Sequence, residues 1–345
     1  MDNPLQGMVI PLLAWYKTHR RELPWRLDQD PYHVWVSEIM LQQTRVEAVI
    51  KYYDRFMEAL PDVQSLSEVP EERLLKLWEG LGYYSRARNL KKAAQMIVHD
   101  CGGVFPDSFE RLIQLPGVGS YTAGAIASIC YNEKVTAVDG NVLRVAARVT
   151  GSRENVLLPE VKKRTEAQLM KILPDDAGTF NEAIMELGET VCLPGGAAKC
   201  GECPLCGGCA AHRDGLTAAL PVRIKQMKRR QEQRTVFLLT DGDGRIAVEK
   251  RPDKGLLAGM YQLPNVEGFL TEHAIRAELE LCGLQVRDIA FLKEAKHAFT
   301  HLDWLMKGYR VEVIRPAGDF LWVTPEELWE RYALPTALKP FAPLP

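Results

Sequence analysis

The sequence lacks a strong excess of charge of either sign. Its 345 residues include 43 Lys or Arg and 45 Asp or Glu, which gives a formal net charge of −2 at pH 7. Many nucleic-acid-binding proteins carry a clear basic excess, so a nucleic acid would have to contact local basic patches of this chain. The best candidate is RIKQMKRRQEQR at residues 223–234, where six basic residues accompany one acid. Taken alone, such a run is typical of a solvated linker, and it marks a domain boundary.

The sequence also lacks long hydrophobic runs, internal repeats and low-complexity tracts. The apolar stretch at residues 8–16 is short, contains Pro11 and follows no basic residue. It therefore predicts the buried face of a first helix rather than a signal peptide or a membrane span. We expect a cytoplasmic protein with no membrane partner. A chain of 345 residues exceeds what one core usually serves, so two or three domains are expected.

The hydrophobic pattern changes at the basic run. Before it, apolar residues recur at three- and four-residue spacing, which predicts helices within residues 34–57, 74–77, 90–98 and 121–130. After Arg234, TVFLLT, DGDG and RIAVEK have the composition of two strands joined by a hairpin turn. A helix is predicted at residues 271–281, with further strands at 286–292 and 304–313. The pattern predicts a helical region followed by a smaller α+β domain.

Cysteines are concentrated in one segment. Five of the eight lie between Cys192 and Cys209, and thiols stay reduced in the cytosol, so metal binding is favoured over disulfides. One set of four has the spacing C-x7-C-x2-C-x5-C and consists of Cys192, Cys200, Cys203 and Cys209. A second set, in which Cys206 replaces Cys192, has three successive C-x2-C steps and suits tetrahedral zinc. The spacing alone leaves both sets open.

A glycine-containing turn lies between two predicted helices, in LPGVGSYTAGAI at residues 115–126. Gly117 and Gly119 permit a sharp turn, and the amides at the start of the next helix suit phosphate binding. Without side chains, the two glycines would also let a nucleic-acid backbone approach closely. The same residues equally fit a plain connection between helices with a glycine cap.

Three motifs together resemble a known family. The hairpin, followed by AVDGNVLRV at residues 137–145, resembles the helix-hairpin-helix DNA glycosylases, which remove damaged or mispaired bases. SEIMLQQT at residues 37–44 is similar to the signature of the adenine glycosylases, which act on adenine opposite 8-oxoguanine. KGLLAGMYQLP, HAFTHLDW and YALPTALKPF resemble the Nudix-like recognition domain of the same enzymes, although IRAELELCGL lacks the glutamates that a Nudix hydrolase needs.

This resemblance implies a multidomain fold. An all-α helix-hairpin-helix glycosylase region would occupy residues 1–215, with a six-helix barrel module at about 25–130 that carries the hairpin at 115–126. An iron–sulfur cluster module would combine the N-terminal helix with residues 131–215. A basic linker at 216–234 would lead to a C-terminal α+β Nudix-like domain at 235–345, which would bind 8-oxoguanine without hydrolysing a nucleotide.

The resemblance also implies catalytic roles. Glu38 lies among apolar residues of a predicted helix, where burial would raise its pKa and keep a proton for a purine nitrogen, although a lone Glu is more often solvated. Asp139 would stabilise the sugar cation or bond briefly to it, with Asn141 and Tyr121 supporting the charge. Enzymes that also cut the backbone carry a nucleophilic lysine at the position of Tyr121, so base removal by water without a Schiff-base step is implied.

Substrate contacts and a cofactor follow from the same resemblance. The implied partner is double-stranded DNA with adenine opposite 8-oxoguanine or guanine, bound by a monomer at the nucleoid. The extruded base and its partner would be met by Gln43, Tyr83 and Leu81, by Trp25, Arg26 and Glu182 near the adenine pocket, and by Phe299, Thr300 and His301 at the 8-oxoguanine. One 4Fe-4S cluster is implied on Cys192, Cys200, Cys203 and Cys209, although the first spacing has one extra residue and Cys206 is additional.

Two other functions fit parts of the sequence. A bifunctional pyrimidine glycosylase with lyase activity would share the helical scaffold and the cluster, but Tyr121 and SEIMLQQT argue against it. A catalytically inactive iron–sulfur DNA-binding protein would be expected to lack Glu38 or Asp139, and both are present.

Overall fold

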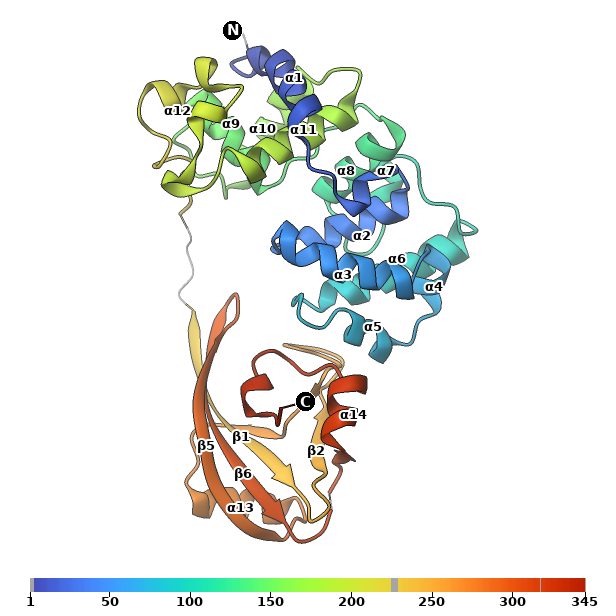
Figure 1. The fold of residues 1–345 in the computed structure, drawn as a ribbon, viewed down its shortest axis with the longest axis vertical. Coiled ribbons are helices and arrows are strands. Elements are labelled where there is room, and N and C mark those ends of the chain that lie inside the picture. The colour runs from blue at the N-terminus through green and yellow to red at the C-terminus, as the bar shows by residue number, and fades with distance from the viewer. Residues whose placement is uncertain (1–2, 225–228, 317, 345) are drawn as a thin grey trace. The chain divides into compact units, whose positions relative to one another are not determined.

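The chain folds into two compact units. The computed structural model describes residues 3–224, 229–316 and 318–344 (Figure 1). Residues 3–68 and 88–224 form the first unit, and residues 69–87 and 229–344 form the second. Of the expected linker at 216–234, residues 225–228 lie outside the described residues. Its other residues join the units on either side, because Val222 bridges to Asn155 and β1 begins at Arg230.

The first unit is built from helices. The α-helices are α1 (Val9–His19), α2 (Pro31–Leu41), α3 (Val46–Ala59), α4 (Val63–Glu68), α6 (Ser85–Asp100), α7 (Phe109–Leu112), α8 (Ser120–Tyr131), α9 (Gly140–Thr150), α10 (Pro159–Met170), α11 (Ala177–Thr190) and α12 (Ala210–Arg213). Short 3-10 helices are η1 (Gln6–Met8), η2 (Pro24–Arg26), η3 (Gly195–Ala197), η4 (Cys200–Glu202) and η5 (Cys206–Gly208). The helical prediction for this region is confirmed. No helix in the described ranges is long and apolar enough to cross a membrane.

Local sequence explains where the central helices begin. Asp30 caps α2 by accepting from the Tyr32 amide, and Pro31 occupies the first helical position, where a missing N–H costs nothing. Gly178 allows α11 to approach α8, because a Cβ there would lie 2.6 Å from the Ser128 carbonyl oxygen. The core that joins α1, α9 and α11 contains Leu12, Val142, Phe180 and Leu187, all fully buried.

The second unit contains a mixed sheet with the order β3-β2-β1-β6-β5. Its elements are α5 (Glu71–Leu77), β1 (Arg230–Thr240), β2 (Ile246–Lys250), β3 (Tyr261–Gln262), β4 (Asn265–Glu267), α13 (Glu272–Leu281), β5 (Val286–Ala298), β6 (Leu302–Val313), β7 (Leu321–Val323), α14 (Pro325–Arg331) and η6 (Lys339–Phe341). β1 runs parallel to β6 and antiparallel to β2 and β4, and β7 pairs with β2. The predicted α+β domain and its first hairpin are confirmed.

Alternate residues of β1 face two different helices. Leu238 belongs to the core that includes Leu328 of α14, whereas Phe237 belongs to the core that includes Ile275 of α13. The sheet is therefore covered on both faces, as Figure 1 shows for α13 and α14. This period of two follows from the alternating direction of side chains in a strand.

Residues 69–87 group with the second unit, although the sequence placed them inside the barrel module at about 25–130. Ion pairs and hydrogen bonds account for this difference. Glu72 lies 3.0 Å from the Lys250 ammonium, Glu79 lies 2.8 Å from that of Lys339, and Lys76 donates to the Tyr332 carbonyl at 3.0 Å. These contacts join residues about 180 or more positions apart, which local sequence patterns do not reveal.

Candidate active site and cysteine cavity

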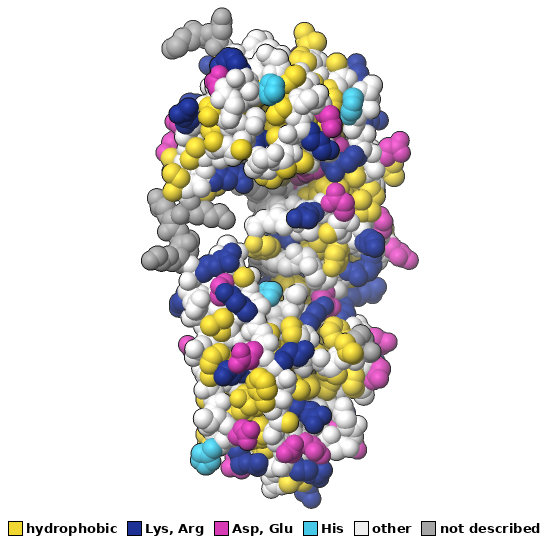
Figure 2. Space-filling model, turned by 60° about the vertical axis from the view of Figure 1, so that its left-hand side comes forward, with side chains coloured by type: hydrophobic (Ala, Val, Ile, Leu, Met, Phe, Trp, Pro, Cys, Tyr) yellow, Lys and Arg dark blue, Asp and Glu magenta, His cyan; other side chains and the backbone are white. Residues whose placement is uncertain are grey.

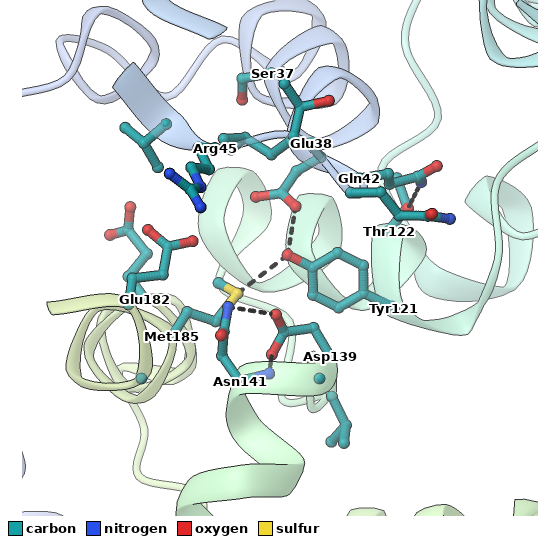
Figure 3. Close-up of a pocket in the computed structure, with 18 of the residues that line it drawn as sticks. Ser37, Glu38, Gln42, Arg45, Tyr121, Thr122, Asp139, Asn141, Glu182 and Met185 are labelled. Atoms are coloured by element: carbon teal, nitrogen blue, oxygen red, sulfur yellow. Dashed lines mark hydrogen bonds between the residues drawn. The ribbon is translucent and has the colours of Figure 1, made fainter. Parts of the chain in front are cut away.

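A cavity of about 1310 Å³ opens in the first unit. It is lined by parts of α2, α8, α9 and α11 and by loops next to them (Figure 3). Ten of the residues singled out from the sequence line it, namely Trp25, Arg26, Glu38, Gln43, Gly117, Gly119, Tyr121, Asp139, Asn141 and Glu182. The fold thus brings together residues spread over more than 150 positions of the chain.

Glu38 is a buried acid at the centre of this cavity. Its residue surface is 7 % exposed, and one carboxyl oxygen accepts a hydrogen bond from the Tyr121 hydroxyl at 2.5 Å (Figure 3). Burial raises the pKa of Glu38 to about 7, although the Tyr121 hydrogen bond lowers it. Near neutral pH a substantial fraction of this carboxyl group therefore carries a proton, as an acid catalyst needs.

Asp139 is held by donors. It caps α9, and its Oδ1 accepts from the amides of Asn141 and Val142 at 2.9 and 2.8 Å, while Oδ2 accepts from the Asn141 side chain at 2.8 Å. Burial raises the pKa of Asp139 above its usual value, and these donors and the nearby Arg144 offset only part of that rise. These three hydrogen bonds favour the charged form of Asp139, which suits it to the ionised role in such a pair of acids.

Arg144 is a residue of the site that the sequence analysis missed. Its guanidinium donates to Asn141 Oδ1 at 2.8 Å and to the Gly188 carbonyl at 2.7 Å, and its Nε donates to the Cys192 carbonyl at 2.7 Å. Arg144 therefore positions the Asn141 amide that contacts Asp139, and it connects this amide through hydrogen bonds to Cys192, the first cysteine of the segment. The motif AVDGNVLRV could have revealed this contact, because Asn141 and Arg144 are three positions apart and such residues share one face of a helix.

A second missed residue lies behind one wall of the cavity and pairs with two arginines that line it. Glu186 is fully buried and lies 2.7 Å from Arg21 Nε and 3.0 Å from Arg26 Nη1. Burial opposes its charge, but the two arginines hold the pKa of Glu186 below its usual value. Arg26 also lies 3.3 Å from Glu182, the predicted pocket residue. Glu186 therefore holds Arg26 in position where it lines the cavity.

The backbone is strained at two of the residues that are expected to meet the extruded base and its partner. Gln43 has φ of 62° and Tyr83 has φ of 47°, and in the described ranges only Asn132 and Leu257 share a positive φ among residues other than glycine. Residues rarely persist in this region unless their surroundings enforce it, and such positions cluster at functional sites. Gln43 lines the cavity, whereas Tyr83 lies in the second unit and is 45 % exposed.

Five predicted contact residues lie in the second unit and do not line this cavity. Leu81 is buried, and Tyr83 is the exposed neighbour of Thr300, with 3.0 Å between their hydroxyl oxygens. Phe299 packs edge-on against Trp304 at 5.0 Å between ring centroids. His301 is exposed, and its carbonyl accepts from the Arg230 amide at 3.2 Å.

The two hairpin glycines have different reasons to be glycine. Gly117 has φ of +78°, and a Cβ there would lie 2.6 Å from that of Asn89, so the turn and its packing already require glycine. Gly119 meets no atom within 4 Å of the position of a Cβ. Gly119 is therefore the position of the two where open space leaves room for an approaching backbone.

Five cysteines line a second, small cavity in the first unit. They are Cys192, Cys200, Cys203, Cys206 and Cys209. Arg148, which is almost fully buried, donates to Cys192 Sγ at 3.2 Å and to the Leu193 carbonyl at 2.7 Å. In the described residues no group of three or more His, Cys, Asp or Glu has the spacing to hold a single metal ion. The donor set still fits soft metals, because these metals prefer thiolate ligands. The buried Arg148 guanidinium would offset the negative charge of the thiolates.

The surface carries charges of both signs. Figure 2 shows basic and acidic side chains interspersed on one face of the molecule. This distribution agrees with the formal net charge of −2.

Comparisons with known proteins agree with this architecture. The family model described as HhH-GPD superfamily base excision DNA repair protein matches residues 36–175, and the NUDIX domain model matches residues 235–343. An adenine DNA glycosylase of Rattus norvegicus is 35 % identical, over 95 % of this chain and 76 % of its own length. One from Buchnera aphidicola subsp. Baizongia pistaciae is 34 % identical, over 84 % of this chain and 82 % of its own. A solved structure of a thermostable thymine-DNA glycosylase has a TM-score of 0.55 at 28 % identity, covering 61 % of this chain and 97 % of that one.

Proposed function

This chain belongs to the adenine DNA glycosylase family, and we propose that it hydrolyses the N-glycosidic bond of adenine paired with 8-oxoguanine, or with guanine, in double-stranded DNA. The observation that carries this proposal is the buried Glu38, which accepts a hydrogen bond from Tyr121 in the cavity that Asp139 also lines. We place the enzyme in the cytoplasm, at the nucleoid, as a monomer, as the resemblance implies.

The carboxyl groups of Glu38 and Asp139 have different roles in the proposed reaction. Breaking the bond between sugar carbon and base nitrogen leaves electrons on the base and positive charge on the deoxyribose. Glu38, with its pKa raised to about 7 by burial, protonates a ring nitrogen of the extruded adenine and makes it a better leaving group. Asp139, held by the Asn141 and Val142 amides, stabilises the sugar cation until water adds to the sugar carbon and gives up a proton to the Glu38 carboxylate.

Tyr121 supports a reaction without a lyase step. A Schiff base requires a nucleophilic amine, and the side chain at this hairpin position is a phenol whose hydroxyl already donates to Glu38. Burial raises the pKa of Tyr121 well above its ordinary value, so the phenol stays protonated. The residue therefore orients the acid instead of attacking the sugar.

The second unit offers a group for the opposite base. Thr300 and Tyr83 come from segments 217 positions apart, yet their hydroxyl groups lie within hydrogen-bonding distance. A Thr hydroxyl donates and accepts, so it suits the changed N7 and C8 edge that distinguishes 8-oxoguanine from guanine. Phe299, held by Trp304, and the exposed His301 flank it. This pairing favours recognition of 8-oxoguanine by residues 299–301.

One 4Fe-4S cluster is the cofactor we propose for the cysteine cavity, held by Cys192, Cys200, Cys203 and Cys209. When bound, it would supply a structural cross-link and no electron transfer to the base. Arg148 would fix Cys192 through its hydrogen bond to Sγ. Zinc on Cys200, Cys203, Cys206 and Cys209 is the alternative.

Strand cleavage of labelled duplexes tests the function. We expect duplexes with adenine opposite 8-oxoguanine or guanine to be cut at the adenine strand only after alkali, and a duplex with cytosine opposite 8-oxoguanine to stay intact. Asp139→Asn should bind the duplex but not release adenine. Cleavage without alkali would identify a lyase, and an Asp139→Asn variant with the parental rate would remove Asp139 from the mechanism.

A further inference from the structure

The segment that follows the cysteine cavity is docked on the first unit. Arg148 Nε donates to the Leu220 carbonyl at 2.9 Å, and the Val156 amide donates to the Val222 carbonyl at 3.0 Å. The Asn155 side chain then holds both peptide groups of Ile224. Its Oδ1 accepts from the Ile224 amide at 3.2 Å, and its Nδ2 donates to the Ile224 carbonyl at 3.3 Å. Residues 220–224 are therefore part of the catalytic unit and not a free tether.

This docking carries Arg223 to the large cavity. The Arg223 guanidinium donates to the Gly140 carbonyl at 3.3 Å, one residue beyond Asp139, and it is among the groups that line the cavity. Its side chain is exposed. Arg21 and Arg26, which also line the cavity, pair with Glu186, but in the described part of the chain no carboxylate lies within 4.0 Å of Arg223.

The Arg223 guanidinium lies beside the cavity and has no acidic partner, so it favours the binding of an anionic group of the ligand. In the proposed reaction Asp139 faces the deoxyribose of the target nucleotide, and a phosphate lies on each side of that sugar. The guanidinium fork suits two phosphate oxygens at once. The nearby Arg144 also repels Arg223 electrostatically, which a bound phosphate would relieve.

We propose that Arg223 binds a phosphate that flanks the target nucleotide, and that Asn155 is the positioning residue which keeps Arg223 there. This inference rests on the proposed function, because that function sets which part of the DNA faces Asp139. It makes the first residues after the cysteine segment a part of the DNA-binding site. The contact fixes the position of the strand and carries no information about its sequence.

Salt-dependent binding of the full chain tests the proposal. The probe is a fluorescent duplex with a tetrahydrofuran abasic site opposite guanine, which keeps both flanking phosphates and needs neither catalysis nor 8-oxoguanine. One lost phosphate contact lowers the slope of log Kd against log salt by about 0.9, so the rise in Kd from about 50 to about 200 mM salt becomes about 3.5-fold smaller. We expect this change for Arg223→Ala and for Asn155→Ala, and a wild-type slope for Arg223→Lys.

Arg213→Ala is the matched control. Arg213 is an exposed arginine paired with Asp214 and does not line the cavity, so its loss removes the same charge and should leave the slope unchanged. An Arg223→Ala slope equal to wild type, or equal to that of Arg213→Ala, would overturn the phosphate contact. A wild-type slope for Asn155→Ala would overturn the positioning role. Failure of the proposed function would instead appear as intact adenine strands with the wild-type protein, whatever these slopes are.

Discussion

Removing one hydroxyl group from the site should move the pH dependence of the reaction. Tyr121→Phe keeps the ring but deletes the hydroxyl that donates to Glu38 at 2.5 Å and also contacts the Met185 sulfur at 3.2 Å. Burial raises the pKa of Glu38 to about 7, and the hydrogen bond from Tyr121 works against that rise. Without the hydroxyl, the pKa of Glu38 should therefore be higher.

The size of the change follows from the strength of the lost bond. A hydrogen bond to a charged group contributes about 1.5–3 kcal/mol, and one pKa unit corresponds to about 1.4 kcal/mol, so the pKa should rise by about 1–2 units. The reaction needs protonated Glu38, so its rate falls as pH rises through that pKa. From about 7 in the parent, the alkaline limb should move to about pH 8–9.

Single-turnover excision from about pH 5 to about pH 10 measures this limb directly. Tyr32→Phe is a matched control, because the Tyr32 hydroxyl is buried and donates to the Leu60 carbonyl at 2.8 Å away from the cavity. The control should keep the parental limb. An unchanged limb in Tyr121→Phe, or one at lower pH, would refute the assignment of Glu38 as the titrating acid.

Three further outcomes follow from the same structure. The folded-state pKa of Glu38 lies above its usual 4.5, so the neutral form stabilises the fold at low pH and that stability is lost as pH rises through about 7. Glu38→Gln should therefore lose excision activity. In urea denaturation its free energy of unfolding should exceed that of the parent by about 3 kcal/mol at pH 8 and equal it near pH 4. Equal free energies of unfolding at pH 8 would contradict this. Thr300→Val should reduce the preference for adenine opposite 8-oxoguanine over adenine opposite guanine in rate assays, and an unchanged ratio would exclude Thr300 from recognition. Cys206→Ser should retain iron and broad visible absorption, whereas Cys203→Ser should lose both; a colourless parent with one zinc would refute the cluster.

Much of the fold could be predicted from the sequence, because its signals are local. The spacing of apolar residues sets the helices of the first unit, and the DGDG turn sets the pairing of β1 with β2. The apolar neighbours of Glu38 in α2 also favour its burial, although the SEIMLQQT resemblance was needed to outweigh the usual solvation of a glutamate. Each of these inferences needs only residues within one turn of a helix or one hairpin.

Contacts between distant segments could not be predicted in this way. The Tyr121 hydroxyl meets Glu38 across 83 positions, and Arg21 meets Glu186 across 165. The end of β5 was missed for a related reason. Residues 293–298 are largely polar, and their strand is fixed by pairing with β6 instead of by a hydrophobic pattern. Such pairs depend on the tertiary fold, which the individual motifs do not encode.

The protonation state of Glu38 tests the proposed mechanism most directly. Carbon-13 NMR of the protein labelled at glutamate carboxyl groups, compared with Glu38→Gln, isolates one carboxyl resonance and its titration. If Glu38 is the catalytic acid, the signal missing from the variant titrates near pH 7 in the parent. A midpoint at the usual value of 4.5 would contradict it, because Glu38 would then be ionised when adenine has to be protonated.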